Sequence, residues 1–369
     1  MANIYIGLMS GTSADSIDCA TLDLSSEEIR ILDCKSFEIP KDLKADIIYS
    51  SQSTTVEREL IDSLNFRMAE VIVDSVKKTI TDLKIEAKDI QAIGSHGQTI
   101  KHEPRSEIPY TLQIGDPQKI SDDLNIKTVG NYRQDDIEAG GEGAPLAPIF
   151  HKKVFGNDKK RKFIVNIGGI TNITDLNYPK VIGFDTGPGN CLMDCWSRVH
   201  NIGNYDDKGS WASSGTINQP LLETMMSDSY FQRKYPKSTG PDYFNHEWIK
   251  KNILRSSSKE ISPKDVQATL LQVTVISLID SINIHKLSDE NIYLCGGGVH
   301  NEFLCKELNR QGKARIRTTL DLGIDPDYVE AICFGWLAKQ RIENKKFNLS
   351  KITGSKGEVY LGRIYEPSK

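Results

Sequence analysis

The sequence predicts an α/β fold built from two similar halves. Short apolar runs that end in small polar residues alternate with two long segments of helical periodicity, at 56–83 and 264–287. In addition, each half opens with two apolar runs joined by a turn of glycine with hydroxyl or amide residues, at 4–24 and at 163–176. Since open α/β sheets bind ligands beyond their strand ends, these turns are the candidate functional site.

The first hairpin is the stretch Ile4–Asp18. Its first strand leads into the turn Ser10-Gly11-Thr12-Ser13, and a second, largely apolar run follows at 19–24. A turn of this composition lets an anion approach the backbone closely. Asp15 and Asp18 would suit a divalent cation or a proton relay. We interpret the hairpin as the phosphate end of a nucleotide site, although most turns of this kind are only turns.

The remainder of the first half continues the sheet. A strand at 31–39 completes an antiparallel meander, and short apolar runs follow at 90–94, 110–114 and 126–130. His96 comes just after the first of these runs and Arg133 just after the last. Either side chain could contact a ligand, or His96 could be a hydrogen-bonded structural histidine and Arg133 part of a loop salt bridge. The charged stretch 156–162 predicts the boundary between the halves.

The second half places further candidates at strand ends. A strand at 181–184 leads to Asp185, which we interpret as an exposed carboxylate: it could act as a general base or cap the following helix or turn. A strand at 291–294 runs into three glycines at 296–298, which could lie against adenine or ribose or allow close helix–strand packing. Glu330 lies one turn into a helix predicted at 327–341; by itself it would usually be a solvated charge.

Composition excludes several functional classes. The 369 residues carry 46 positive and 50 negative side chains, a net charge of −4, which gives no electrostatic case for nucleic acid or an acidic membrane. No stretch approaches the roughly 18 uninterrupted apolar residues of a membrane span, and we expect no secretory signal. The seven scattered cysteines favour reduced thiols in a cytoplasm. Cys191 and Cys195 lack a second ligand pair, so we predict no zinc site.

Several nucleotide and hydrolase motifs are absent. The chain has no P-loop, no protein-kinase signature set and no complete G-x-G-x-x-G. Asp185-Thr186-Gly187 matches the short string of aspartic proteases, but that chemistry needs a second such loop and the chain has none.

Taken together, the motifs resemble those of the anhydro-N-acetylmuramic acid kinases, a family within the superfamily of sugar kinases, actin and the large heat-shock chaperones. The matching blocks follow the family's order over nearly the whole chain: G-L-M-S-G-T-S-A-D-S-I-D (7–18), G-S-H-G-Q-T (94–99), Q-I-G-D-P (113–117), A-G-G-E-G-A-P-L (139–146), N-I-G-G-I-T-N-I-T (166–174), G-F-D-T-G-P-G-N (183–190), C-G-G-G (295–298) and P-D-Y-V-E-A (326–331).

The resemblance implies two actin-like (ribonuclease H-like) lobes, at 1–155 and 156–369, with ATP in the cleft between them. It implies that ATP, water and 1,6-anhydro-N-acetylmuramic acid give N-acetylmuramic acid 6-phosphate and ADP, in cell-wall recycling. Mg²⁺ would bridge phosphate oxygens, and we assign it no protein ligand. The family is also the basis for expecting a homodimer.

The resemblance also assigns roles to individual residues. Asp185 matches the base that activates water, and Glu330 matches a carboxylate near the sugar. His96, Arg133 and Asp135 match the sugar-side loops. The residues that match the cofactor-binding turns are Gly11, Thr12, Ser13, Ala14, Asp15, Ser16, Ile17, Asp18, Asn166, Gly168, Gly169, Gly296, Gly297 and Gly298.

Three positions depart from the family pattern. Ser16 replaces a glycine, Asn131 replaces the aspartate of D-F-R, and Glu142 replaces the glutamine of G-G-Q-G. Ser16 could alter the turn if that position needs a positive φ, Asn131 removes a charge near the sugar loops, and Glu142 adds one. These departures keep two alternatives open on the same frame: a nucleotide-gated sensor, which binds ATP without sugar-dependent ADP release, and a phosphoanhydride hydrolase.

Overall fold

The structure, a computed structural model, divides the chain into two compact units. It describes residues 3–53, 55–156, 161–177, 180–256, 260–283, 291–312 and 315–368. Unit 1 comprises Met1–Val154 and Asp327–Lys369, and unit 2 comprises Phe155–Pro326. The first boundary falls beside the predicted one. Residues 327–369, however, belong to unit 1 and not to the second lobe at 156–369, because helix α12 (Val329–Ile342) packs on the first strand of the chain.

Unit 1 is organised around a six-stranded sheet. Its order is β15-β7-β4-β1-β2-β3, where β1 to β3 form the predicted antiparallel meander and β4 and β7 run parallel to β1. The C-terminal strand β15 pairs antiparallel with β7 and closes that edge. The strands are β1 (Ile4–Ser10), β2 (Ser16–Asp23), β3 (Arg30–Glu38), β4 (Ile90–Ser95), β7 (Thr128–Gly130) and β15 (Arg363–Tyr365), with a separate hairpin of β5 (Gln98–Glu103) and β6 (Tyr110–Ile114).

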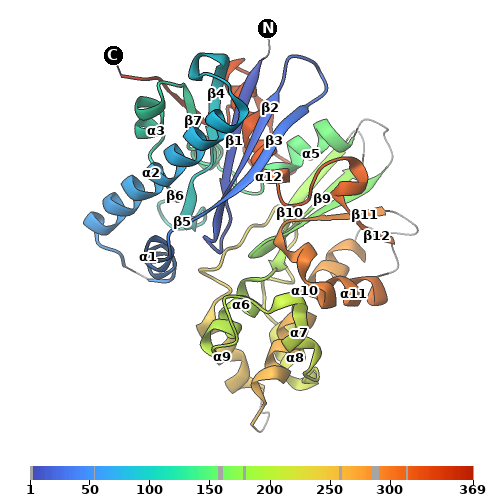
Figure 1. The fold of residues 1–369 in the computed structure, drawn as a ribbon. Coiled ribbons are helices and arrows are strands. Elements are labelled where there is room, and N and C mark those ends of the chain that lie inside the picture. The colour runs from blue at the N-terminus through green and yellow to red at the C-terminus, as the bar shows by residue number, and fades with distance from the viewer. Residues whose placement is uncertain are drawn as a thin grey trace. The chain divides into compact units, whose positions relative to one another are not determined.

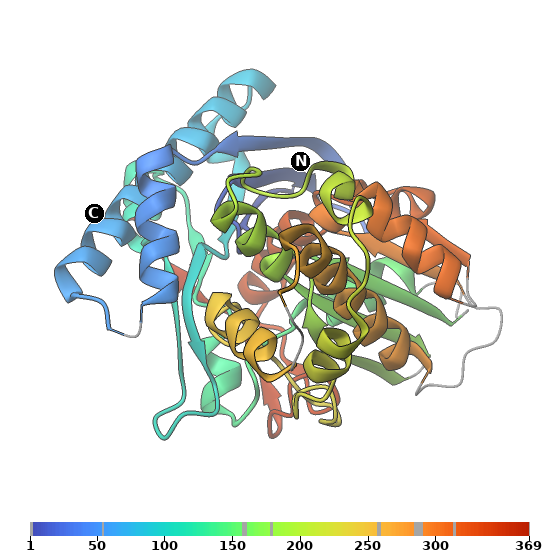
Figure 2. The ribbon, with the colours of Figure 1, turned by 90° about the horizontal axis from the view of Figure 1, so that it is seen from below.

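The core of unit 1 joins the sheet to the long helix α2 (Arg58–Leu83). Ile6 and Leu8 of β1 share one buried cluster with Leu64, Met68 and Ile72, which recur along α2 with helical spacing. Helix α1 (Lys41–Gln52) lies beside α2 (Figure 2). The shorter helices of the unit are α3 (Pro117–Leu124), α4 (Gln134–Glu138) and α5 (Ala147–Phe155).

Backbone contact joins β1 to α12 (Figure 1). A Cβ atom added at Gly7 would lie 1.9 Å from the carbonyl oxygen of Ala331 and 2.4 Å from the backbone nitrogen of Gly335. A Cβ atom added at Gly335 would lie 3.1 Å from the backbone nitrogen of Gly7. Strand and helix therefore approach so closely that neither position has room for a side chain.

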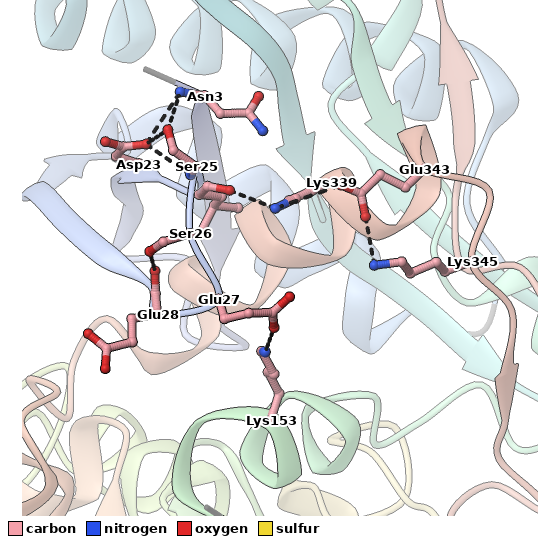
Figure 3. Close-up of polar contacts among 11 residues, drawn as sticks. Asn3, Asp23, Ser25, Ser26, Glu27, Glu28, Lys153, Lys339, Glu343 and Lys345 are labelled. Carbon is pink, nitrogen blue, oxygen red and sulfur yellow. Dashed lines mark hydrogen bonds and ion pairs between the residues drawn. The ribbon is translucent and has the colours of Figure 1, made fainter. Parts of the chain in front are cut away.

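The loop between β2 and β3 is tied to two helices of unit 1 (Figure 3). Lys339 of α12 donates a hydrogen bond from Nζ to the carbonyl oxygen of Leu24, at 2.6 Å. Glu27 forms an ion pair with Lys153 of α5. The N-terminal end of β1 joins the same loop, because the backbone N–H of Asn3 donates to Ser25 Oγ at 2.9 Å. These contacts fix the far end of the meander.

Unit 2 repeats the sheet of unit 1. Its order, β10-β9-β8-β11-β12, has the same strand sequence and directions as β3-β2-β1-β4-β7, with three antiparallel strands followed by two parallel ones. The predicted duplication is thus confirmed, and the topology is that of the actin-like, ribonuclease H-like fold. The strands are β8 (Lys162–Ile167), β9 (Ile170–Asn177), β10 (Lys180–Pro188), β11 (Asn291–Cys295) and β12 (Arg315–Thr318).

Helix α10 (Pro263–Asn283) lies in the core of unit 2. By length and composition it could cross a membrane, but 78% of its apolar window is buried inside the protein, as expected for a core helix. Residues 284–287 of the predicted helix lie outside the described residues. The other helices are α6 (Cys191–Val199), α7 (Ser210–Ser213), α8 (Gln219–Met226), α9 (His246–Arg255) and α11 (Glu302–Gln311), and a small hairpin of β13 (Phe347–Asn348) and β14 (Glu358–Val359) belongs to unit 1.

We predict that Gly7→Ala lowers the free energy of unfolding of unit 1 by roughly 3 kcal/mol, because the new methyl group overlaps the backbone of α12. Gly11→Ala is the matched control, since an added Cβ there meets no atom within 4 Å. Urea unfolding of both variants measures the difference. Equal midpoints for the two variants would contradict the close approach.

Candidate active site

The first predicted phosphate turn connects β1 and β2. The N–H of Ala14 donates to the carbonyl oxygen of Gly11 at 3.0 Å, and Ala14 takes a left-handed φ of 50°. The side chains of Thr12 and Ser13 are exposed, and space around Gly11 is open. Those of Ala14 and Ile17 lie in the hydrophobic core, so they can offer a ligand only backbone groups.

The two carboxylates of this hairpin have different partners. Asp15 is exposed and forms an ion pair with Lys44 of α1. Asp18 Oδ1 accepts hydrogen bonds from Ser36 at 2.9 Å and from Ser16 at 3.4 Å. Burial raises the pKa of Asp18 to about 6, and the negative charge of Asp327 adds to the rise. The like-charged neighbour of Asp18 is thus Asp327 just before α12, a pairing that sequence reasoning missed because the two residues lie at opposite ends of the chain.

His96 and Arg133, both predicted on the sugar side, are in contact. Arg133 Nε donates to His96 Nε2 at 3.0 Å, and His96 Nδ1 lies 3.0 Å from the carbonyl oxygen of Gly97. This pairing assigns the proton to Nδ1. Burial, with the nearby guanidinium, holds the pKa of His96 well below 6.5. His96 is therefore a neutral group that orients Arg133.

Asp135 lies apart from that pair. It forms a 3.4 Å ion pair with Arg363, and burial raises its pKa. The neighbouring Asp136, which the sequence did not single out, is fully buried and anchors the glycine-rich loop 139–145. Its Oδ2 accepts from the N–H of Gly143 at 2.8 Å, and its Oδ1 accepts from Thr353 Oγ1 at 2.7 Å. Asp135 and Asp136 therefore have structural partners within unit 1.

Glu330 lies in the first turn of α12 and is half-buried. It stands one helical turn before Phe334, whose ring centroid lies 4.7 Å from that of His96. Residues four apart in a helix share one side. Glu330 therefore lies on the side of α12 that faces His96.

The second predicted phosphate turn connects β8 and β9 in unit 2. The carbonyl oxygen of Gly168 accepts from the N–H of Asn190, and that of Gly169 accepts from Gly189 and Cys191, all at 2.8–3.1 Å. The start of α6 therefore uses its free N–H groups to hold the carbonyl side of the turn.

A row of polar side chains crosses three strands beside this turn. Asn166 of β8 pairs with Asn172 of β9, which pairs with Asp185 of β10. Directly paired residues point to the same face of a sheet. The Oδ1 atoms of Asn166 and Asn172 are buried and have no hydrogen-bond partner among the described residues. The row brings the predicted residues Asn166 and Asp185 together and adds Asn172, which the sequence did not single out.

The three glycines after β11 lie next to the same row. Gly296 has a φ of 77°, and a Cβ atom there would lie 2.1 Å from Asn166 Oδ1. A Cβ atom at Gly298 would overlap Ile167, whereas one at the exposed Gly297 would meet nothing within 4 Å. Gly296 and Gly298 therefore serve packing, and Gly297 is the position open to a ligand.

Asp185 is buried, with 5% of its surface exposed, which corrects the exposed carboxylate predicted from the sequence. Its Oδ2 accepts from the backbone N–H of Thr239 at 3.0 Å, and its own N–H donates to the carbonyl oxygen of Lys237 at 3.1 Å. Tyr230 Oη donates to the carbonyl oxygen of Asp185 at 2.8 Å. The segment that covers Asp185, 230–239, reads in sequence only as a loop.

The three departures have local explanations. Ser16 does not have a positive φ, and its hydroxyl binds Asp18. Asn131 has a φ of 55°, a conformation that suits asparagine, and donates to Tyr365 Oη at 2.6 Å. The charge of Glu142 is paired with Arg105 at 2.6 Å. Unit 1 thus accommodates all three residues without an unpaired charge or a strained turn.

The residues present fit a nucleotide and a magnesium ion. The buried oxygens of Asn166, Asn172 and Thr171, which no described residue hydrogen-bonds, leave hydrogen-bonding capacity beside an open glycine. Asp18 and Asp327 offer two hard carboxylate ligands, and Mg²⁺ commonly takes one or two carboxylates with water and phosphate. Within the described residues, no group of three or more His, Cys, Asp or Glu side chains could hold a metal ion.

We predict that acid lowers the free energy of unfolding of unit 1, because unit 1 contains buried histidines. Burial lowers the pKa of His151 to about 3, whereas an unfolded histidine titrates near 6.5. Below pH ~6.5 the unfolded chain binds a proton that the folded chain does not, so the free energy of unfolding falls by about 1.4 kcal/mol per pH unit for each such histidine. Urea unfolding between pH 6 and 4 measures how steeply the free energy of unfolding changes with pH. In His151→Gln this dependence should be weaker by about the same amount per pH unit. An unchanged slope would contradict a neutral, buried His151.

Comparison with known proteins identifies the family. The sequence model of the anhydro-N-acetylmuramic acid kinases matches residues 3–367. The anhydro-N-acetylmuramic acid kinase of Coxiella burnetii (strain Dugway 5J108-111) is 40% identical over 365 residues, which cover 98% of this chain and 97% of that protein. That of Aliivibrio fischeri (strain ATCC 700601 / ES114) is 40% identical over 364 residues, 98% of each chain. The chain, a kinase with two actin-like units, belongs to the anhydro-N-acetylmuramic acid kinase family.

Proposed function

We propose that the protein opens the 1,6-anhydro ring of 1,6-anhydro-N-acetylmuramic acid with water and transfers a phosphoryl group from ATP to O6. The products are N-acetylmuramic acid 6-phosphate and ADP, which would return a cell-wall sugar to metabolism. Family membership over 98% of the chain supports the substrate class. The observation that carries the mechanism is the buried row Asn166–Asn172–Asp185, which sets a held carboxylate beside unsatisfied amide oxygens.

Asp185 is the base in this proposal. The hydrogen bond from the backbone N–H of Thr239 to Oδ2 orients the carboxylate, which would take the proton of the attacking water. The water oxygen bonds to the anomeric carbon, the bond from that carbon to O6 breaks, and O6 becomes the phosphoryl acceptor. Phosphoryl transfer asks a protein chiefly for positioning and charge stabilisation, which matches the hydrogen-bonded turns.

The remaining predicted residues divide between nucleotide and sugar. When bound, ATP supplies the phosphoryl group and Mg²⁺ neutralises its charge. We assign the turns at 11–16 and 168–169 to the phosphates, Asp18 and Asp327 to the metal, and Gly297 to the adenosine side. Arg133, oriented by His96, and Glu330 are assigned to the sugar. No observation favours the sensor or the phosphoanhydride hydrolase, because the three departures that prompted them have local explanations.

We also propose that the protein is cytoplasmic and acts as a homodimer. All seven cysteines are free thiols, which suits a reducing compartment. The dimer rests on the family resemblance, and the molar mass in solution tests it.

Asp185→Asn should lower kcat by about 10²- to 10⁴-fold, the usual contribution of a general base, because the amide cannot take the proton. Asparagine keeps an oxygen for the N–H of Thr239, so the thermal midpoint should stay close to that of the parent protein. The assay measures ADP release from ATP and Mg²⁺ with and without the anhydro sugar, together with the product mass. Full activity in Asp185→Asn, or ADP release that does not depend on the sugar, would contradict the proposal.

Gly297→Ala should raise the KM for ATP by about 5- to 150-fold, the equivalent of the 1–3 kcal/mol that an overlapping methyl group costs. The added Cβ meets no protein atom within 4 Å, so folding should be unaffected. Gly203→Ala, in an exposed loop of unit 2, is the control and should leave KM unchanged, even though its added Cβ would lie 3.3 Å from the carbonyl oxygen of Tyr205. Identical KM values for both variants would remove Gly297 from the nucleotide site.

A further inference from the structure

A buried lysine lies beside the proposed base. Lys237 is 4% exposed, although lysine is among the residues most rarely buried. Its backbone carbonyl accepts the N–H of Asp185, and Thr239, two residues further on, donates to the carboxylate. One short segment therefore holds Asp185 at both its backbone and its side chain and also carries the ammonium group.

Among the described residues, the ammonium has one long hydrogen bond and two aromatic rings as neighbours, besides the charge of Asp185. Its Nζ lies 3.5 Å from the carbonyl oxygen of Tyr230, at the outer limit of a hydrogen bond. It also lies 4.5 Å from the ring centroid of Tyr230 and 5.9 Å from that of Phe184. Aromatic faces attract cations, but they do not replace the hydration that a buried ammonium loses. A nearby carboxylate is the group that compensates for this loss.

The charged groups that act on Lys237 are Asp185 and Arg233. Burial lowers the pKa of Lys237 to about 8; Asp185 opposes this change and Arg233 adds to it. Arg233 is exposed and lies 5.5 Å from the ring of Tyr230. Lys237 is therefore protonated at neutral pH and below, where a carboxylate base gains or loses its proton.

We propose that Lys237 is a positioning residue for Asp185: its buried ammonium keeps the carboxylate ionised, so that the base remains ready to accept a proton from water. The inference rests on the proposed function, which makes Asp185 the base. It extends that function by assigning a task to a second residue of the segment that covers Asp185. Lys237 and Asp185 interact electrostatically, and an opposite charge near a carboxylate lowers its pKa, an effect that a pH profile can measure.

The test is the pH profile of kcat/KM for the anhydro sugar. Without the ammonium, the carboxylate of Asp185 is protonated at higher pH, so the acidic limb of Lys237→Met should move upward by about one unit or more. Lys237→Arg keeps the charge and should leave the limb near its parent position. Arg233→Met removes the other cation of the cluster and should not move the limb upward. A merely structural role would lower activity at every pH without moving the limb.

A second measurement does not require a lysine variant to fold. Coupling between two titrating groups is reciprocal, so removing the charge of Asp185 must affect Lys237 equally. In Asp185→Asn, the NMR titration midpoint of the Lys237 ammonium should fall below that of the parent protein by the same shift. An unchanged midpoint together with an unmoved limb would overturn the inference.

The outcomes separate the two proposals. If Asp185→Asn keeps its activity, the proposed base is wrong and the inference falls with it. If Asp185→Asn is inactive but the limb of Lys237→Met does not move, the base stands and the role of Lys237 is refuted. A raised KM for ATP in Lys237→Met with an unmoved limb would make Lys237 a phosphate ligand and would also overturn the inference.

Discussion

Unit 1 depends on the contact between the backbones of β1 and α12. At Gly7 and Gly335 the central strand and a helix from the other end of the chain meet with no side chain between them. This contact brings the start of α12 to the carboxyl ends of the sheet, where Asp327 lies within electrostatic reach of Asp18 and Phe334 packs on His96. The candidate residues of unit 1 are therefore assembled by a packing constraint in which none of them takes part.

The sequence predicted those features of the fold that depend on local pattern. Alternating apolar residues and glycine turns specify the meanders, and their recurrence specifies the duplication, because both signals lie within one stretch of chain. Which sheet a helix covers depends on distant residues, so the return of 327–369 to unit 1 was not predicted. The burial of Asp185 was not predicted for the same reason. The turn after its strand indicated a candidate residue, but the segment around Lys237 that covers it is apparent only from tertiary contacts.

Unit 2 buries several polar and charged side chains around the proposed base. Asn166 and Asn172 hold buried oxygens that have no hydrogen-bond partner in the part of the chain that the structure describes, and Asp185 and Lys237 bring opposite charges out of water. Burying such groups costs free energy unless each finds a partner, so stability alone does not explain the arrangement. Preorganised dipoles and charges act strongly where water is excluded, which is the environment that a reaction with developing charge requires.

The division of the chain also determines the order in which its parts can fold during synthesis. Unit 2 is one continuous segment, Phe155–Pro326, and all of it leaves the ribosome before α12 and β15 do. Domains fold as units as they emerge. Until the last residues are made, β1 lacks the helix that contacts Gly7, and β7 remains an unpaired edge. The sheet of unit 1 is therefore completed only when the C-terminal residues have been made, whereas unit 2 can fold earlier.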